Sequence, residues 1–295
     1  MLTKDDAIDF VRSVLKIEDV EEKFKKDQYA LLCSITKKYV HTEPFQNLTL
    51  LATKHEERHC PTLDEIQKDI YSTVGGLCFH HNVFMKYLLE SLGYQVHFIA
   101  CDIRFPGNHV AVLVKELIKP GDSYYVDVGC GYLIEQPISM QFDEKSQIYH
   151  QGFIRYQFVR KNGVIQRIQT IAKFRPVLQK EITKERNWFV FLEMTLEPRE
   201  LDYFSEAMRK VYTVRNAHSG WFLNDIRMVH KAQGKLVALK NTTFFSENEN
   251  NELVDTTLLS KNDLIKWVEK YTPQIAVSNI NPAVTNIQLQ FECGE

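Results

Sequence analysis

The chain has 295 residues, with 36 basic and 38 acidic side chains and a formal net charge of −2. This near balance gives no reason to expect a nucleic acid or an anionic membrane surface as a partner. The length allows one compact unit or a few small subdomains, and a hydrophobic content of 44% is typical of an ordinary globular protein.

The N-terminus and the cysteines indicate a cytosolic protein. The first residues contain no apolar core of signal-peptide length, and no apolar run elsewhere is long enough to span a bilayer. The six cysteines form no CxxC pair, which is typical of reduced thiols rather than of a disulfide framework. We therefore expect a cytoplasmic protein, and we expect it to be a monomer.

The first ninety or so residues are predicted to be mainly helical. Thr3 followed by two acids is typical of a helix N-cap, and residues 62–65 resemble a capping box. Apolar side chains recur at helical spacing in three segments: residues 7–15, 27–40 and 63–71.

From residue 94 onward the pattern changes to strands. β-branched and aromatic residues concentrate in short segments separated by Gly, Pro, Asp or Asn signals: residues 95–100, 109–114, 124–128, 154–160, 164–171 and 188–196. The last of these strands is expected to end at Pro198. Beyond it we predict a helix over 201–211, a strand over 235–240, a polar loop over 246–252 and a last helix over 262–271.

The stretch from Gly75 to Gly93 is the centre of the pattern. Two glycines precede Cys78, and residues 79–92 are apolar on nearly every face, as in a helix buried at the centre of a domain. Gly93 provides a left-handed stop for this helix. Cys78 is then at the helix start, where unpaired backbone N–H groups and the helix dipole favour a nucleophilic thiolate. For a single cysteine, the plainer interpretation is a buried structural thiol.

Two later residues complete a possible catalytic set. His109 opens one predicted strand, and Asp127 ends the next. Neighbouring strands could bring these side chains together near their ends, beside Cys78. A nucleophile, a base and an orienting acid would then be in place. Each residue alone is weak evidence, because a strand histidine is usually a core residue and an aspartate before Val-Gly is usually a turn residue.

The sequence around these residues resembles the arylamine N-acetyltransferases. Gly75-Gly76-Leu77-Cys78 followed by Asn82 resembles the cysteine motif of that family. Residues 108–114 are similar to its histidine strand and residues 125–131 to its aspartate segment. Two further segments, 44–48 and 195–199, are also similar, so the resemblance runs in order from about Thr3 to Phe244.

The resemblance implies an α+β fold with a papain-like cysteine triad. It implies a helical domain over 1–93 that carries the nucleophile, an antiparallel β-barrel domain over 94–200 that carries His and Asp, and an α/β lid over 201–295. It also implies ping-pong transfer of an acetyl group from acetyl-CoA through Cys78 to an arylamine or arylhydrazine, with no metal and no permanently bound cofactor. The implied substrate contacts are Gly107, Cys130 and Gly131, and the implied structural positions near the site are Phe45, Gly75, Gly76 and Asn82.

The chain departs from the family pattern at three places. Val74 replaces an arginine and Gln46 replaces a glutamate, and in the family these two charges are thought to pair. We interpret the double change as a compensated swap, because a single buried charge left alone would cost about 3–5 kcal/mol. Cys130 stands where the family commonly has phenylalanine, which predicts a larger acceptor pocket. Residues after Phe244 match the family poorly.

Three alternatives stay open. The same triad could serve an amide synthase, a cysteine peptidase, a transglutaminase or another acyltransferase or hydrolase. The chain could also be a catalytically silent binding protein that kept the fold. A metal site of Cys78, His80 and His81 is disfavoured, because adjacent side chains on a helix point about 100° apart.

Overall fold

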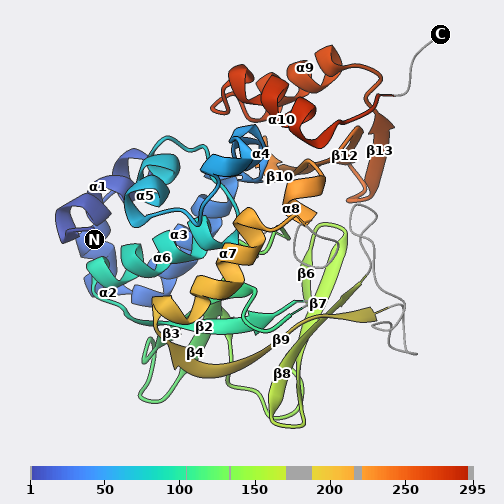
Figure 1. The fold of residues 1–295 in the computed structure, drawn as a ribbon. Helices are drawn as coiled ribbons and strands as arrows, with labels where there is room; N and C mark the ends of the chain where they lie inside the picture. The colour runs from blue at the N-terminus through green and yellow to red at the C-terminus, as the bar shows by residue number, and fades with distance from the viewer. Residues whose placement is uncertain (1, 104, 133, 171–187, 216–220, 292–295) are drawn as a thin grey trace.

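The computed structural model describes residues 2–103, 105–132, 134–170, 188–215 and 221–291. The fold is α+β, as expected. Helices near the N-terminus pack against a curled antiparallel sheet, and a smaller sheet with two helices lies at the far end of the molecule (Figure 1). No helix in these ranges combines the length and the apolar character that crossing a membrane requires.

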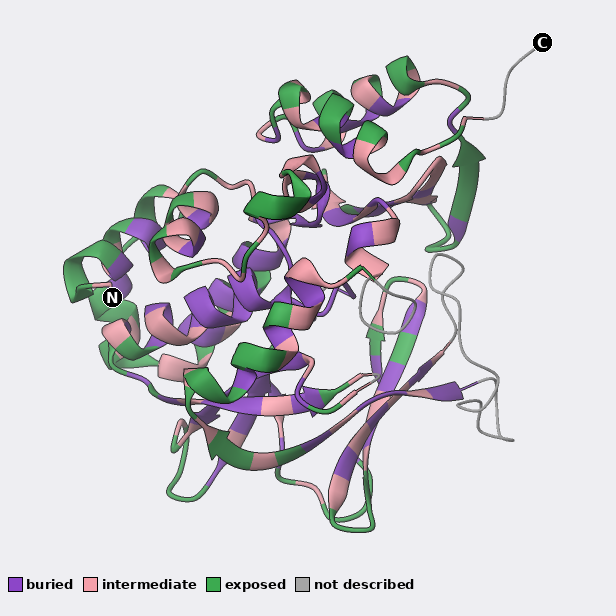
Figure 2. Ribbon diagram, in the orientation of Figure 1, coloured by how far each residue is buried: buried purple, intermediate pink, exposed green. Residues whose placement is uncertain are grey.

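Helices predominate in residues 2–92. Their bounds are α1 Lys4–Ser13, α2 Val20–Lys26, α3 Gln28–Thr42, α4 Leu48–Ala52, α5 Leu63–Tyr71 and α6 Cys78–Leu92, with a 3-10 turn η1 at His55–Glu57. The predicted N-cap at Thr3 and the predicted capping box at Thr62 are both present, and Thr3 also forms a capping box, with Asp6. The predicted stop of α6 is confirmed as well, because Gly93 has a φ of 105° in the left-handed region. Most of α6 is buried (Figure 2).

The large sheet has the strand order β5-β4-β3-β2-β9-β8-β7-β6, and its paired strands are all antiparallel. The bounds are β2 Gln95–Asp102, β3 His109–Lys115, β4 Ser123–Val126, β5 Ile138–Ser139, β6 Tyr149–Gln151, β7 Ile154–Lys161, β8 Val164–Thr170 and β9 Trp188–Arg199. Within the described residues the end strands β5 and β6 do not pair with each other. The sheet is therefore an open half-barrel, whose concave shape is visible in Figure 1.

The small sheet has the order β1-β10-β11-β12-β13. Its strands are β1 Phe45–Gln46, β10 Arg227–Ala232, β11 Lys235–Lys240, β12 Thr243–Glu247 and β13 Leu253–Thr257. The remaining helical elements are η3 Leu201–Phe204, α7 Ser205–Thr213, α8 Trp221–Asn224, α9 Lys261–Tyr271, η4 Val277–Asn279 and α10 Ile280–Ile287. Strand β1 thus joins a segment near the N-terminus to the C-terminal sheet.

Two hydrophobic clusters hold the fold together. The larger one joins the N-terminal helices to the half-barrel. The smaller one lies between α4, the small sheet, α9 and α10, and it includes Leu48 and Leu51. Residues 45–52 therefore pack with the C-terminal part of the chain. The division into domains 1–93, 94–200 and 201–295 stays a prediction.

Several predicted boundaries were wrong, each for a local reason. Strand β9 continues through Pro198, which lies opposite Ile99 where the pairing with β2 shifts register. A proline is tolerated at such an irregularity because the ladder does not need its missing N–H. Helix α10 follows the helix that the sequence predicted to be the last, and strands β10, β12 and β13 were not predicted. Strand β13 is mostly exposed, so it lacks the alternation that identifies a half-buried strand.

Candidate functional site

The loop before Cys78 is held against strand β1. The Gly76 carbonyl accepts a hydrogen bond of 2.9 Å from the Gln46 N–H, and the Gly76 N–H donates one of 3.3 Å to the Pro44 carbonyl. Gly75 has a φ of +70°, and a Cβ there would lie 1.9 Å from the Pro44 oxygen. Both observations require glycine at this position. The loop therefore fixes where helix α6 begins.

Gln46 and Val74 show how the loop is held without a buried charge. The buried Gln46 side chain donates to the Val74 carbonyl at 3.3 Å and to Thr49 Oγ1 at 3.0 Å. Its oxygen accepts from the Thr49 N–H at 3.2 Å. The Gln46 side-chain amide therefore has only neutral hydrogen-bond partners among these contacts. This agrees with the interpretation that the loss of one charge at position 46 is compensated by the loss of the other at position 74.

The structure brings Cys78, His109 and Asp127 together. Cys78 is the first residue of α6, His109 is the first residue of β3, and Asp127 directly follows β4. His109 Nε2 donates a hydrogen bond of 2.9 Å to Asp127 Oδ2. Cys78 lies close enough to His109 to contribute to the raised pKa of its imidazole. Because Nε2 faces the carboxylate, Nδ1 is the ring nitrogen left for the sulfur.

The charges of this pair support each other. Burial alone would lower the pKa of His109, but the charge and hydrogen bond of Asp127, followed by contact with Cys78, raise that pKa well above its usual value. Burial likewise opposes ionisation of Asp127. The His109 charge and hydrogen bonds from three side chains outweigh burial and hold the Asp127 pKa below its usual value. The site therefore favours an imidazolium beside a carboxylate.

Asn82 connects helix α6 to β3 and to the segment after β4. Its Nδ2 donates to Asp127 Oδ1 at 2.8 Å and to the Val110 carbonyl at 2.7 Å. Its Oδ1 accepts from the Val128 N–H at 3.0 Å. A single buried side chain on α6 therefore links the helix that begins at Cys78 to the chain segments that carry His109 and Asp127.

Tyr125 and Gly129 complete the surroundings of Asp127. The Tyr125 hydroxyl donates a hydrogen bond of 2.6 Å to Asp127 Oδ2, and the Gly129 N–H donates one of 3.2 Å to Oδ1. A Cβ on Gly129 would lie 2.8 Å from the Cys78 Cα, so this glycine lets the segment after β4 pack against Cys78. Sequence reasoning did not identify Tyr125, although it is two residues before Asp127 and so on the same side of an extended strand.

The other predicted site residues lie around this centre. Phe45 stacks on His81 with ring centroids 6.3 Å apart. Gly107 has a φ of +66° in the turn before His109, and its N–H donates to Asp102 Oδ1 at 2.7 Å. Gly131 is buried with a φ of +68°. The predicted substrate contacts of Gly107, Cys130 and Gly131 stay predictions.

Arg167 is a buried residue that the sequence did not reveal. It lies on β8, its Nη1 donates to the Cys130 sulfur at 3.3 Å, and its guanidinium lies 4.8 Å from the Tyr156 ring centre. At least part of the space that a phenylalanine at position 130 would fill is therefore taken by a guanidinium. Charged residues are rarely fully buried, so no pattern rule would have placed this one inside.

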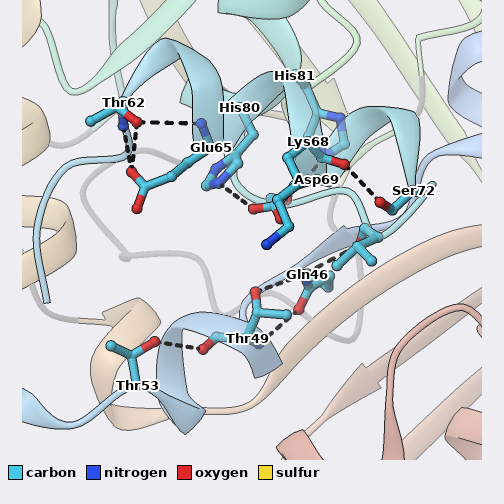
Figure 3. Close-up of polar contacts among 12 residues, drawn as sticks. Gln46, Thr49, Thr53, Thr62, Glu65, Lys68, Asp69, Ser72, His80 and His81 are labelled. Atoms are coloured by element: carbon cyan, nitrogen blue, oxygen red, sulfur yellow. Dashed lines mark hydrogen bonds and ion pairs between the residues drawn. The ribbon is translucent and has the colours of Figure 1, made fainter. Parts of the chain in front are cut away.

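The two adjacent histidines of α6 contact different partners. His81 Nε2 donates to the Gly76 carbonyl at 3.0 Å, and its Nδ1 accepts from the Tyr39 hydroxyl at 3.3 Å. His80 instead contacts Asp69 (Figure 3). It also contacts Tyr212, and all three residues line a pocket of about 240 Å³. The described part of the chain contains no group of three or more His, Cys, Asp or Glu residues arranged to hold a metal ion.

Comparison with known proteins agrees with this architecture. A family model described as N-acetyltransferase matches residues 29–278. The chicken (Gallus gallus) protein named arylamine N-acetyltransferase, pineal gland isozyme NAT-3, is 24% identical over 270 residues, which are 84% of this chain and 88% of that protein. The chicken isozyme NAT-10 is 28% identical over 142 residues, or 45% of this chain and 47% of its own.

Solved structures share the fold at low sequence identity. The arylamine N-acetyltransferase of Mycobacterium marinum in complex with CoA has a TM-score of 0.74 at 14% identity, covering 96% of this chain and 100% of that one. The Bacillus cereus enzyme, described as having a unique Cys-His-Glu catalytic triad, has a TM-score of 0.67 at 17% identity, covering 90% and 96%. Since the family model spans most of the chain and includes Cys78, His109 and Asp127, this protein belongs to the arylamine N-acetyltransferase family.

Proposed function

We propose that this protein transfers an acetyl group from acetyl-CoA to an arylamine or arylhydrazine, through an acetyl group held on Cys78. The observation that carries the proposal is the placement of Cys78, at the start of a buried helix, near a histidine that is hydrogen-bonded to a buried aspartate. The relative from M. marinum was solved in complex with CoA, which supports acetyl-CoA as the donor. No permanently bound cofactor is needed for this chemistry.

In the first half-reaction the Cys78 thiolate attacks the carbonyl carbon of the thioester. A new carbon–sulfur bond forms, the bond to the CoA sulfur breaks, and the His109 imidazolium gives its proton to the departing sulfur. Helix α6 begins at Cys78 without a side-chain cap on its first N–H groups. These N–H groups are suited to stabilise the negative oxygen of the tetrahedral intermediate.

In the second half-reaction the amine nitrogen attacks the acetyl carbon. Neutral His109 takes the N–H proton, the bond to Cys78 breaks, and the thiolate–imidazolium pair is restored. Asp127 stays ionised throughout, holds the ring in place and stabilises its charged form. Only 6% of Cys78 is exposed, which helps to keep water away from the acetyl-cysteine.

The test is a screen of acyl donors and aromatic amine acceptors with the wild type and with Cys78→Ala. We expect amide formation by the wild type with acetyl-CoA, and none by the variant. Release of free acetate at the rate of donor consumption, with or without an amine, would instead support a hydrolase. Binding of acetyl-CoA without any acyl transfer would support a catalytically silent member of the fold.

We further propose that the enzyme acts in the cytoplasm as a monomer built from domains 1–93, 94–200 and 201–295. The balanced charge and the uncrosslinked cysteines in the described ranges support the cytoplasmic location. Light scattering on the purified protein checks the monomer, and fractionation of cells that express it checks the location.

A further inference from the structure

The Gly76 carbonyl, two residues before the nucleophile, is bound by two donors. The Gln46 N–H donates to it at 2.9 Å, and His81 Nε2 donates to it at 3.0 Å. A carbonyl oxygen has two lone pairs, so both are used. The Gly76 N–H in turn donates to the Pro44 carbonyl at 3.3 Å. The peptide groups on either side of the Gly76 Cα are therefore both held by hydrogen bonds.

His81 is itself held in one orientation and one tautomer. Its Nδ1 lies 3.3 Å from the Tyr39 hydroxyl. A carbonyl only accepts hydrogen bonds, so Nε2 carries the hydrogen that faces Gly76, and Nδ1 accepts from the hydroxyl. Figure 3 shows the His81 ring pointing away from the side on which His80 contacts Asp69. The ring is thus a fixed part of the loop's support.

The His81 ring is a neutral donor. It is fully buried, and the Phe45 ring stacks on it with centroids 6.3 Å apart. Burial first, and then the neighbouring His80, lowers the pKa of His81 to about 3. The ring therefore holds the Gly76 carbonyl near pH 7 without adding a positive charge that would compete with the His109 imidazolium for the thiolate.

The fixed peptide groups lead directly to the reacting atoms. Only Leu77 separates Gly76 from Cys78, and it is buried with an extended backbone. The Cys78 N–H has no partner within the helix, because Cys78 is the first residue of α6. The segment after β4 packs on the Cys78 Cα, where a Cβ on Gly129 would lie at 2.8 Å. The direction of the Cys78 N–H is therefore set by the loop before it and by the packing at its Cα.

We propose that His81 is a positioning residue for acyl transfer, because its hydrogen bond to the Gly76 carbonyl holds the loop that aims the Cys78 N–H at the thioester oxygen. The proposal rests on the proposed function, since it concerns the formation of the acetyl-cysteine. A loop peptide that turned would misdirect this N–H. It would also leave a partly negative carbonyl oxygen near the place where negative charge develops.

The acylation step shows where the N–H acts. The Cys78 sulfur bonds to the thioester carbon, and an electron pair of the carbonyl moves onto its oxygen, where the Cys78 N–H stabilises it. The electron pair then returns as the bond to the CoA sulfur breaks, and that sulfur takes the proton of His109. His81 neither gains nor loses a proton, so its effect is on geometry alone.

Two reactions of the same thiolate provide the test. Acetylation by acetyl-CoA forms a negative oxygen, whereas alkylation by iodoacetamide displaces iodide from a saturated carbon and needs only the thiolate. We would measure both rates at Cys78 by intact-protein mass and peptide mapping. We expect His81→Leu to lower the acetylation rate about 100-fold, the effect of a displacement of about 1 Å, and the alkylation rate less than threefold. Tyr39→Phe, which removes the hydroxyl that holds Nδ1, should lower acetylation about tenfold and leave alkylation unchanged.

Val83→Ala is the control for a loss of packing in the same helix. Val83 is fully buried on α6 and lies with Leu63 and Ile66 around a small cavity on the α5 side, away from the loop. We expect its ratio of acetylation to alkylation to equal that of the wild type.

The outcomes separate a positioning role from a structural one. Equal losses of acetylation and alkylation in His81→Leu, or an acetylation rate that does not change, would overturn the proposal. If His81→Leu does not fold, a ratio in Tyr39→Phe equal to that of the wild type would overturn it. A wild type that iodoacetamide alkylates at Cys78 but that forms no acetyl-enzyme would instead refute the proposed function.

Discussion

Two histidine–carboxylate pairs flank the start of α6, and their surroundings differ. The His109–Asp127 pair lies at the ends of β3 and β4, with side chains 2% and 0% exposed and a contact of 2.9 Å. The His80–Asp69 pair lies between helices at the edge of a pocket, with side chains 11% and 34% exposed and a contact of 3.5 Å. The same two residue types therefore occur once in a dry setting and once in a wetter one. We call His109–Asp127 the dry pair and His80–Asp69 the wet pair.

The partners of the two carboxylates explain what each setting can do. Asp127 receives hydrogen bonds from His109, Tyr125, Asn82 and the Gly129 N–H. In the described ranges the Asp69 carboxylate contacts only His80. A fully satisfied buried carboxylate keeps its charge and fixes one geometry, whereas a partly exposed carboxylate with a single partner is held less firmly. We therefore assign acyl transfer to the dry pair alone.

The largest expected effect comes from exchanging the two carboxylates for amides. Asp127→Asn should lower kcat with an arylamine about 10⁴-fold, as the equivalent change does in serine triads, because it removes the charge that stabilises the imidazolium. Asp69→Asn should change the same kcat only a few-fold. Steady-state kinetics with acetyl-CoA and aniline make the comparison, and similar losses in both variants would remove the distinction between the pairs.

The substitution Gly129→Ala should disturb the geometry of the dry pair and lower turnover, by less than Asp127→Asn does. Its Cβ would lie 2.8 Å from the Cys78 Cα and 3.0 Å from Asn82 Nδ2, so the strand end must shift. A displacement of about 1 Å can reduce turnover about 100-fold. Gly121→Asn is the control, because a Cβ there would meet no described atom within 4 Å and asparagine tolerates its positive φ. Unchanged turnover in Gly129→Ala would show that the contact does not position Cys78.

Removing one hydroxyl from the dry pair should have a moderate effect. Tyr125→Phe deletes the 2.6 Å hydrogen bond to Asp127, and a bond to a charged group contributes about 1.5–3 kcal/mol. We expect the free energy of unfolding in urea to fall by about that amount. Tyr124→Phe is the control on the opposite face of β4. Equal effects in both variants would show that the hydroxyl of Tyr125 does not support the carboxylate.

The buried residue His81 should make the free energy of unfolding depend on pH. Burial first, and then the neighbouring His80, lowers the pKa of His81 from 6.5 to about 3. The unfolded chain therefore binds a proton at this residue between pH 6.5 and about 3 while the folded protein does not. Stability is lost as the pH falls through this window, by up to about 1.4 kcal/mol per pH unit.

His81→Gln should remove this part of the acid sensitivity, although the loss of two buried contacts also lowers the overall stability. The readout is the slope of the unfolding free energy between pH 6.5 and pH 5, measured by urea denaturation. His150→Gln, at an exposed position of β6, should keep the slope of the wild type. A slope in His81→Gln as steep as in the wild type would contradict the buried neutral histidine.

The dry pair could be predicted from the sequence because its parts follow local rules. Cys78 comes directly after two glycines at the start of an apolar run, and His109 and Asp127 lie next to turns that bound successive strands. In an antiparallel pair the start of one strand lies beside the end of the next, so the histidine and the aspartate had to approach each other. Three local observations were therefore enough to place the set.

The wet pair could not be predicted in this way. His80 and Tyr212 are 132 residues apart and come from two helices whose contact depends on the tertiary packing. Strand β1 was missed for a similar reason, since residues 45 and 46 pair with β10 from the far part of the chain. No local periodicity encodes either contact, and only the folded structure shows them.

The most direct test of the dry pair is a single-turnover experiment read by intact-protein mass and peptide mapping. Wild type mixed with acetyl-CoA should gain one acetyl group, located on the peptide that contains Cys78, and should lose it when an arylamine is added. Cys78→Ala should gain none, and Asp127→Asn should gain it far more slowly. An acetyl group on another residue, or equal rates of acetylation in wild type and Asp127→Asn, would contradict the assignment of Cys78, His109 and Asp127.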